Sequence, residues 1–240
     1  MIQYKTIGKW MMTACVAAFA ASCSENTMDR INEDINHPQD VPAKFTVSDI
    51  TLNTAVSATG GDLNLYAAVY MEHETGTTNQ MWRADQRAGE PTASSTYNNS
   101  WLNIYGNIKN AKIAINKCQN SSEDQGNTTT EAIARILLAY NAALATDMFG
   151  DTPFSQTGIL NEDGTPTYMQ PKIDTQESIY KEIMQELDKA IGLLDEGKSK
   201  DNGFSGAIGN RDYIYAGNAA KWLKAAYALK ARYTMRLLNR

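Results

Sequence analysis

The sequence predicts a mainly all-α fold, a tetratricopeptide-like scaffold of helical repeats with long decorated loops. Four segments space their apolar residues along one helix face, with a period of about 3.6 residues. No alternating run is long enough for a well-formed strand, although short strands are expected within residues 81–90 and 203–215. The helices are irregularly spaced and their loops are long, which distinguishes this pattern from a pure repeat array.

Helices and their start signals follow one another along the chain. Two adjacent glycines separate a short from a medium expected helix, at residues 52–58 and 63–71. Four clearer helices follow, within residues 101–118, 133–148, 179–194 and 222–237. Two capping-box spacings predict helix starts, Thr128 with Glu131 and Asp174 with Glu177. Trp101 lies on the apolar face of its helix and is expected in the core.

Composition excludes several classes of protein. Hydrophobic residues make up 42% of the chain, which is typical of a folded protein. The 22 basic and 27 acidic residues give a net charge of −5, which argues against a nucleic-acid partner. Two histidines and three cysteines are too few for a multi-histidine metal centre or a disulfide framework. We therefore expect neither a metal nor a cofactor.

The N-terminus has the features of a secretory signal. Lys5 and Lys9 precede an uncharged stretch, residues 10–21, which is shorter than the ~20 residues that a membrane span needs. The following Ala-Ala-Ser-Cys sequence, residues 20–23, looks like a bacterial lipobox, in which Cys23 receives a diacylglycerol. Acyl chains such as palmitate would then anchor the protein in a membrane. The alternative is an ordinary signal peptide with an incidental Cys23.

These features predict the domain organisation. Residues 1–22 are interpreted as a lipoprotein signal peptide, residues 23–44 as a polar tether with two prolines, and residues 45–240 as the helical domain. Cys15 would leave with the signal, and Cys118, among apolar neighbours, is expected to be a core residue.

Motifs that carry enzyme chemistry are missing from the sequence. It has no phosphate-binding glycine loop, nucleophile elbow or zincin motif, and we expect a protein that is not an enzyme. The adjacent Glu72, His73 and Glu74 would point in different directions on a helix, which argues against a metal site. The basic residues of the last helix are expected to form a solvated face or ion pairs between helices, with ligand binding as the open alternative.

Residues 79–99 are the best candidate for a ligand site. This segment places Trp82 and Tyr97 among amides, hydroxyls and Arg83, and Asn98 follows Tyr97. Aromatic rings stack on the C–H face of a sugar, and amides and guanidinium groups reach its hydroxyls. The alternative for Trp82, and the more favoured one for Tyr97, is that the ring covers the end of the helical core.

Several motifs in order along the chain resemble the SusD/RagB family of outer-membrane nutrient-binding lipoproteins, in its SusD-like branch. They are the lipobox with Cys23, the Asn-His-Pro turn at 36–38, the segment 138–154 with its Asp-Met-Phe-Gly-Asp-Thr-Pro-Phe motif, and segments 174–180, 187–191 and 229–233. In the central motif, Gly150 is expected to allow a tight exit from the helix, Asp151 to bind turn amides and Pro153 to stiffen the bend.

The resemblance implies a cell-surface lipoprotein of the outer membrane that binds glycans, or peptides in some members. It also implies that captured oligosaccharide passes to a SusC-like, TonB-dependent transporter. The alternative is a helical scaffold that contacts the barrel and binds no small ligand. Family chains are much longer, so we expect this sequence to be an N-terminal half, incomplete at its C-terminus.

Overall fold

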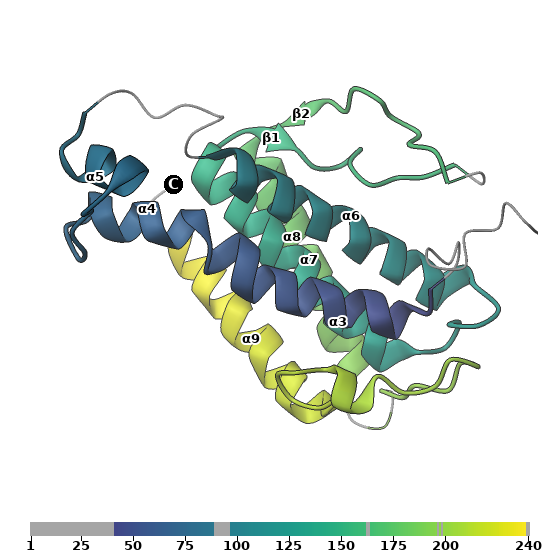
Figure 1. Ribbon diagram of the computed structural model, residues 1–240. Helices are drawn as coiled ribbons and strands as arrows, with labels where there is room; N and C mark the ends of the chain where they lie inside the picture. The colour runs from purple at the N-terminus through teal and green to yellow at the C-terminus, as the bar shows by residue number, and fades with distance from the viewer. Residues whose placement is uncertain (1–40, 89–96, 162–163, 196, 198, 239–240) are drawn as a thin grey trace, which may run out of the picture. The chain divides into compact units, whose positions relative to one another are not determined.

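The computed structural model describes residues 41–88, 97–161, 164–195, 197 and 199–238 (Figure 1). The chain divides into two units, Met1–Val41 and Pro42–Arg240, and the helices belong to the second. The expected signal peptide, Cys23 and nearly all of the expected tether lie outside the described residues.

The described part of the chain is mainly α-helical, as predicted. Its helices are α3 (Ala43–Asn53), the π-helix η1 (Thr54–Thr59), α4 (Asp62–Tyr70), α5 (Asn79–Asp85), α6 (Asn98–Asn120), α7 (Thr128–Phe149), α8 (Gln176–Leu194) and α9 (Ala219–Arg236). Strands β1 (Thr152–Pro153) and β2 (Ile173–Asp174) pair antiparallel, and the 3-10 turn η3 spans Gly209–Arg211. The four predicted long helices are confirmed. α3 begins at Ala43, so it includes the last two residues of the expected tether.

The predicted short strands are wrong. Residues 81–85 of the first stretch belong to α5, because Met81 and Ala84 pack as one helix face against α4. In the second stretch, residues 203–215, the chain forms turns and η3, held by amide donors that converge on the buried carboxylate of Asp212. No sequence pattern predicted β1 and β2, which are two residues each.

Helix α7 forms the centre of the bundle. It contacts α6 and α8 most extensively and also touches α3 and α9 (Figure 1). All but two of the residues from Thr129 to Thr146 are buried, and six of the buried residues are alanines. Small side chains let four neighbouring elements approach one helix closely. By length and hydropathy α7 would be able to cross a membrane, but 72% of its most apolar window is buried, as expected of a core helix.

Buried polar side chains on α7 are paired with its neighbours. The Asn107 amide donates to Asn141 Oδ1 and to Thr54 Oγ1, at 3.1 Å each, and the Asn141 amide donates to Thr54 Oγ1 at 2.9 Å. Buried amides without partners would cost free energy, so this triad restrains the packing of η1, α6 and α7. Arg135 bridges Glu131, at 2.7 Å, and Glu186 of α8 in the same way.

Neither predicted capping box forms. At the start of α7, the Thr130 N–H donates to Asp201 Oδ1 at 3.0 Å, and Glu131 pairs with Arg135 instead of reaching back to the helix start. At the start of α8 the cap is Thr175, whose hydroxyl accepts from the Ser178 N–H at 3.3 Å. Distant chain segments therefore replace a local cap at α7.

The expected structural role of the segment that follows α7 is confirmed. Gly150 has a φ of +75°, a conformation that favours glycine, and it ends α7. Asp151 Oδ1 accepts from the Gln176 N–H at 2.8 Å, which joins this turn to the start of α8. Cys118 is buried in the core as predicted, and burial raises the pKa of its thiol.

Asp174 on β2 holds this turn from inside. Burial acts to raise the pKa of its carboxyl, but the Ser155 N–H and hydroxyl, the Phe154 N–H and Lys172 outweigh it, so the pKa is lowered. The Ser155 N–H donates at 2.7 Å and the Phe154 N–H at 3.0 Å. A lowered pKa means that the ionised carboxylate stabilises the fold above the unfolded-state pKa, and that this contribution is lost as the pH falls.

We predict that Asp174→Asn lowers the free energy of unfolding by about 1–3 kcal/mol at neutral pH, since an amide nitrogen replaces an acceptor of buried N–H groups. The deficit should shrink as the pH falls below about 4, because the unfolded chain then takes up a proton that the native carboxylate, with its lowered pKa, binds only at still lower pH. Urea unfolding across this pH range tests the prediction, with the exposed Asp49→Asn as the matched control. A deficit independent of pH would contradict it.

Candidate ligand-binding site

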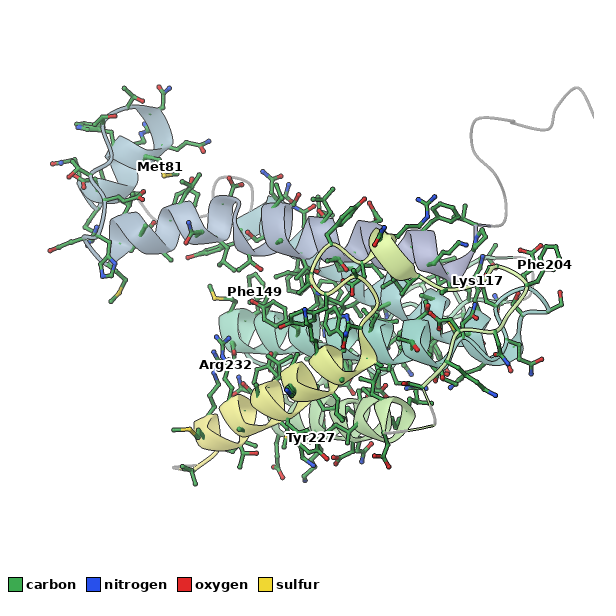
Figure 2. The ribbon with its side chains drawn as sticks, turned by 90° about the horizontal axis from the view of Figure 1, so that it is seen from below. Met81, Lys117, Phe149, Phe204, Tyr227 and Arg232 are labelled. Atoms are coloured by element: carbon green, nitrogen blue, oxygen red, sulfur yellow. The ribbon has the colours of Figure 1, made fainter. Side chains whose placement is uncertain are left out.

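Helices α4 and α5 form a hairpin with a small core of its own. Tyr66, Val69 and Ala84 are buried together, and Tyr70 and Met81 pack against them, apart from the main cluster around α7. Figure 1 shows α4 and α5 at one end of the bundle, and Figure 2 shows Met81 far from Phe149 at the end of α7. The hairpin therefore presents a surface that the main core does not cover.

Close backbone packing fixes the base of the hairpin. A Cβ on Gly60 would lie 2.7 Å from the Ala55 carbonyl oxygen, so the exit from η1 requires glycine. The Asn99 amide of α6 donates to Asp62 Oδ2 of α4 at 2.8 Å, which ties the hairpin to the next long helix. At its tip the Arg87 guanidinium donates to the Tyr70 carbonyl at 2.8 Å.

Three non-glycine residues of this region have positive φ angles. They are Glu72, Asn79 and Arg87, with φ of 60°, 48° and 53°. Such conformations cost about 1–3 kcal/mol each and cluster at ligand-binding and active sites. Asn79 is the first residue of α5, so the backbone strain lies directly at the helix that carries Trp82.

A wide cavity of about 930 Å³ opens between the start of α4 and α5. The polar groups in its wall are Asp62, Thr78, Asn79, Gln80 and Arg83, and the apolar side chains are Leu65, Met81 and Trp82. Its volume falls in the range of small-molecule sites. Gln80 accepts from the Tyr66 hydroxyl at 3.2 Å, so one wall is supported by the hairpin core.

Trp82 is the prominent feature of the cavity, with 49% of its surface exposed. It belongs to neither cluster of buried hydrophobic residues and lines the cavity. Arg83 makes no ion pair with any residue that the structure describes. A half-exposed indole beside a guanidinium and several amides offers one stacking face and donors for hydroxyl oxygens.

Two of the four predicted ligand-binding residues line the cavity and the other two do not. Trp82 and Arg83 both line the cavity. Tyr97 instead lies at the start of α6, with its ring 6.2 Å from Phe149, and the exposed Asn98 is not part of the cavity wall. Trp101 packs on Phe149 at 5.0 Å and is partly buried, so it covers the end of α7 more than it fills the core.

Asp62 was missed by the sequence argument. It follows the glycine pair at the first turn of α4, where an acidic side chain is common because its charge interacts favourably with the helix dipole. Asn79 and Gln80 belong to the segment singled out from the sequence, but nothing in their spacing distinguishes them from the rest of that segment. Within the described ranges, no group of three or more His, Cys, Asp or Glu residues is placed to hold a metal ion.

Comparisons with known proteins agree with the fold. A family model, SusD-like, described as starch-binding and associating with the outer membrane, matches residues 36–240. A SusD/RagB family protein from Bacteroides thetaiotaomicron is 45% identical, with a TM-score of 0.74 over 84% of this chain and 39% of its own. The comparison with curated proteins finds no match.

More distant structures share the fold. A chitin-binding protein is 24% identical with a TM-score of 0.58, covering 82% of this chain and 39% of its own. Surface glycan-binding protein A from Bacteroides fluxus is 20% identical with a TM-score of 0.55, covering 80% and 38%. The chain thus spans about two fifths of the length of these proteins. With a family model that matches most of its length and a relative at 45% identity, this chain belongs to the SusD-like family of outer-membrane-associated binding proteins.

Proposed function

We propose that this chain is a cell-surface lipoprotein that captures an oligosaccharide at the α4–α5 cavity for import by a SusC-like, TonB-dependent transporter. The observation that carries the proposal is the half-exposed Trp82 beside Arg83, which makes no ion pair with any described residue, in a cavity whose other polar lining groups are amides, a hydroxyl and one carboxylate. The family description as starch-binding supports a carbohydrate ligand, and the names of two structural neighbours include chitin or glycan.

The cavity offers complementary contacts for a sugar ring. The indole of Trp82 would stack on the apolar C–H face, which leaves the ring hydroxyls at its edge. Arg83 and the amides of Asn79 and Gln80 would donate to hydroxyl oxygens, and Asp62 would accept from a hydroxyl. The hairpin core holds these groups before a ligand arrives, which lowers the ordering cost of binding.

The same wall argues for binding and against hydrolysis. Glycoside hydrolysis by the common mechanisms requires two carboxyl groups on opposite sides of the scissile bond. Among the described residues that line the cavity, Asp62 is the single acid, and its Oδ2 is occupied by the Asn99 amide. We therefore infer a protein that is not an enzyme, in line with a family of binding proteins.

Substitution of Trp82 tests the site. We expect Trp82→Ala to weaken binding of a responsive glycan by about tenfold or more, since the stacking surface is lost, and Trp82→Phe to retain part of the affinity. Isothermal titration against a panel of neutral and acidic oligosaccharides provides the measurement. Leu102→Ala, which removes a 61%-exposed apolar side chain on α6, is the matched control.

Equal affinity of wild type and Trp82→Ala would show that the glycan does not bind at this cavity. If no glycan in the panel binds while the chain still co-purifies with a barrel transporter, the helical scaffold without a small ligand is the better description. Binding of peptides alone would place the chain among peptide-binding members.

Substitution of Cys23 tests the anchor. The lipobox predicts that Cys23 is the first residue of the mature chain and carries a diacylglycerol. We expect mass spectrometry of the N-terminal peptide to show this modification, and Cys23→Ser to release the protein from the membrane fraction because acyl burial is lost. An unmodified amino terminus downstream of residue 23 would contradict the prediction.

A further inference from the structure

A hydrogen bond connects the core of the α4–α5 hairpin to the wall of the candidate cavity. Tyr66 of α4 is buried with Val69 and Ala84 and does not itself line the cavity. Its hydroxyl donates to Gln80 Oε1 on α5 at 3.2 Å, and Gln80 does line the cavity. The two helices contact each other, as Figure 1 shows, so this bond joins them from inside the hairpin.

This bond determines which end of the Gln80 amide is available to a ligand. A side-chain amide has an oxygen, which accepts, and an NH2 group, which donates. Because Oε1 is bonded to the Tyr66 hydroxyl, the NH2 group is the end that remains for the cavity. Without that hydroxyl the amide would be able to rotate by half a turn and present its oxygen instead. Tyr66 therefore decides whether Gln80 donates or accepts.

The acceptor of the cavity is oriented in a similar way. Asp62 Oδ2 accepts from the Asn99 amide of α6 at 2.8 Å, so Oδ1 is the oxygen that remains for a ligand. Arg83 follows Gln80 by three residues and lies on the same face of α5. A guanidinium has five N–H donors and no acceptor. The wall thus sets donors on α5 opposite a carboxylate oxygen at the start of α4.

This arrangement distinguishes two kinds of ligand oxygen. A sugar hydroxyl that accepts from Gln80 or Arg83 still carries a proton, which finds no acceptor on these two side chains. A desolvated donor without a partner costs free energy. A carbonyl or carboxylate oxygen has no proton to place, so it meets the same donors without this cost. Thr78 and Asn79 can both donate and accept, so they do not discriminate between the two.

We propose that Tyr66 is a positioning residue for Gln80, and that the cavity selects sugars with an acceptor-only oxygen: the carbonyl of an acetamido group or the carboxylate of an acidic sugar. Such a sugar would stack on Trp82 and place this oxygen against Gln80 and Arg83. One of its hydroxyls would donate to Asp62 Oδ1. The inference rests on the proposed glycan-binding function and adds the class of ligand to it.

Matched oligosaccharides test this selection on the full chain. Members of the first pair share length and linkage and carry either an acetamido group or a hydroxyl at C2. Members of the second pair carry either a carboxylate or a hydroxymethyl group at C5. Isothermal titration should show that, in at least one pair, the member with the acceptor-only oxygen binds about fivefold or more tightly than its partner. The pair that responds identifies the group as carbonyl or carboxylate.

Single variants test the role of each side chain in this affinity ratio. Tyr66→Phe should reduce the ratio to about twofold or less, because the amide is no longer oriented. Tyr70→Phe should preserve it, since Tyr70 stacks on Tyr66 at 6.1 Å but does not line the cavity. Gln80→Glu should abolish the preference, because both ends of a carboxylate accept. Gln86→Glu, which adds the same charge just after α5 and outside the wall, should not.

A double variant separates positioning from a purely structural role of Tyr66. In the Gln80→Glu background the group that faces the ligand accepts in either orientation, so Tyr66→Phe should change the affinity ratio no further. A hairpin that is merely destabilised would instead bind every sugar more weakly in both backgrounds, with the ratio of the wild type kept in Tyr66→Phe. Circular dichroism and melting temperature establish that each variant is folded.

The outcomes distinguish this inference from the proposed function. Binding that depends on Trp82 but has equal affinity for both members of each pair would overturn the selection and leave glycan binding in place. An affinity ratio that Tyr66→Phe leaves unchanged would overturn the positioning role. Absence of binding by all four oligosaccharides and by the wider glycan panel would overturn the proposed function and this inference together.

Discussion

Burial of α7 on every side is the constraint on which the rest of this fold depends. An isolated helix of this composition would leave most of its apolar surface in water, so it is stable only when several elements enclose it. The alanines allow α6 and α8 to pack closely, and the asparagine–threonine triad and the Glu131–Arg135–Glu186 cluster satisfy its polar groups. Loss of either polar cluster would leave buried groups without partners.

The enclosing elements also determine what remains free for function. The triad joins η1 to α6 and α7, and η1 leads directly into the glycine turn and the α4–α5 hairpin. The hairpin thus begins from a fixed point of the core while its own side chains stay outside that core. One buried network therefore positions the candidate ligand-binding cavity.

Sequence periodicity predicted the long helices because each has a continuous apolar face. Trp82 and Arg83 were predicted as ligand-binding residues from the chemistry of their side chains. Prediction from local sequence failed where contacts with distant segments determine the helix start or the position of a side chain. Asp201, 71 residues away in the sequence, accepts from the Thr130 N–H at the start of α7. Asp174 accepts from the Phe154 N–H in the turn after α7. Because of these contacts, neither local capping box forms. Tyr97 belongs to the same amide-rich segment as Trp82. At the start of α6, however, its ring packs against Phe149. Asp62 enters the cavity through tertiary packing that no local pattern encodes.

The central claim is that glycan binds at the hairpin and that the helical body only supports it. The indole N–H resonances in a 15N-labelled chain test this directly, since Trp82, Trp101 and Trp222 report on the cavity, the end of α7 and the core at the start of α9. Addition of a responsive glycan should shift the Trp82 resonance strongly and leave those of Trp101 and Trp222 in place. A shift confined to Trp101 or Trp222, with Trp82 unmoved, would contradict the account.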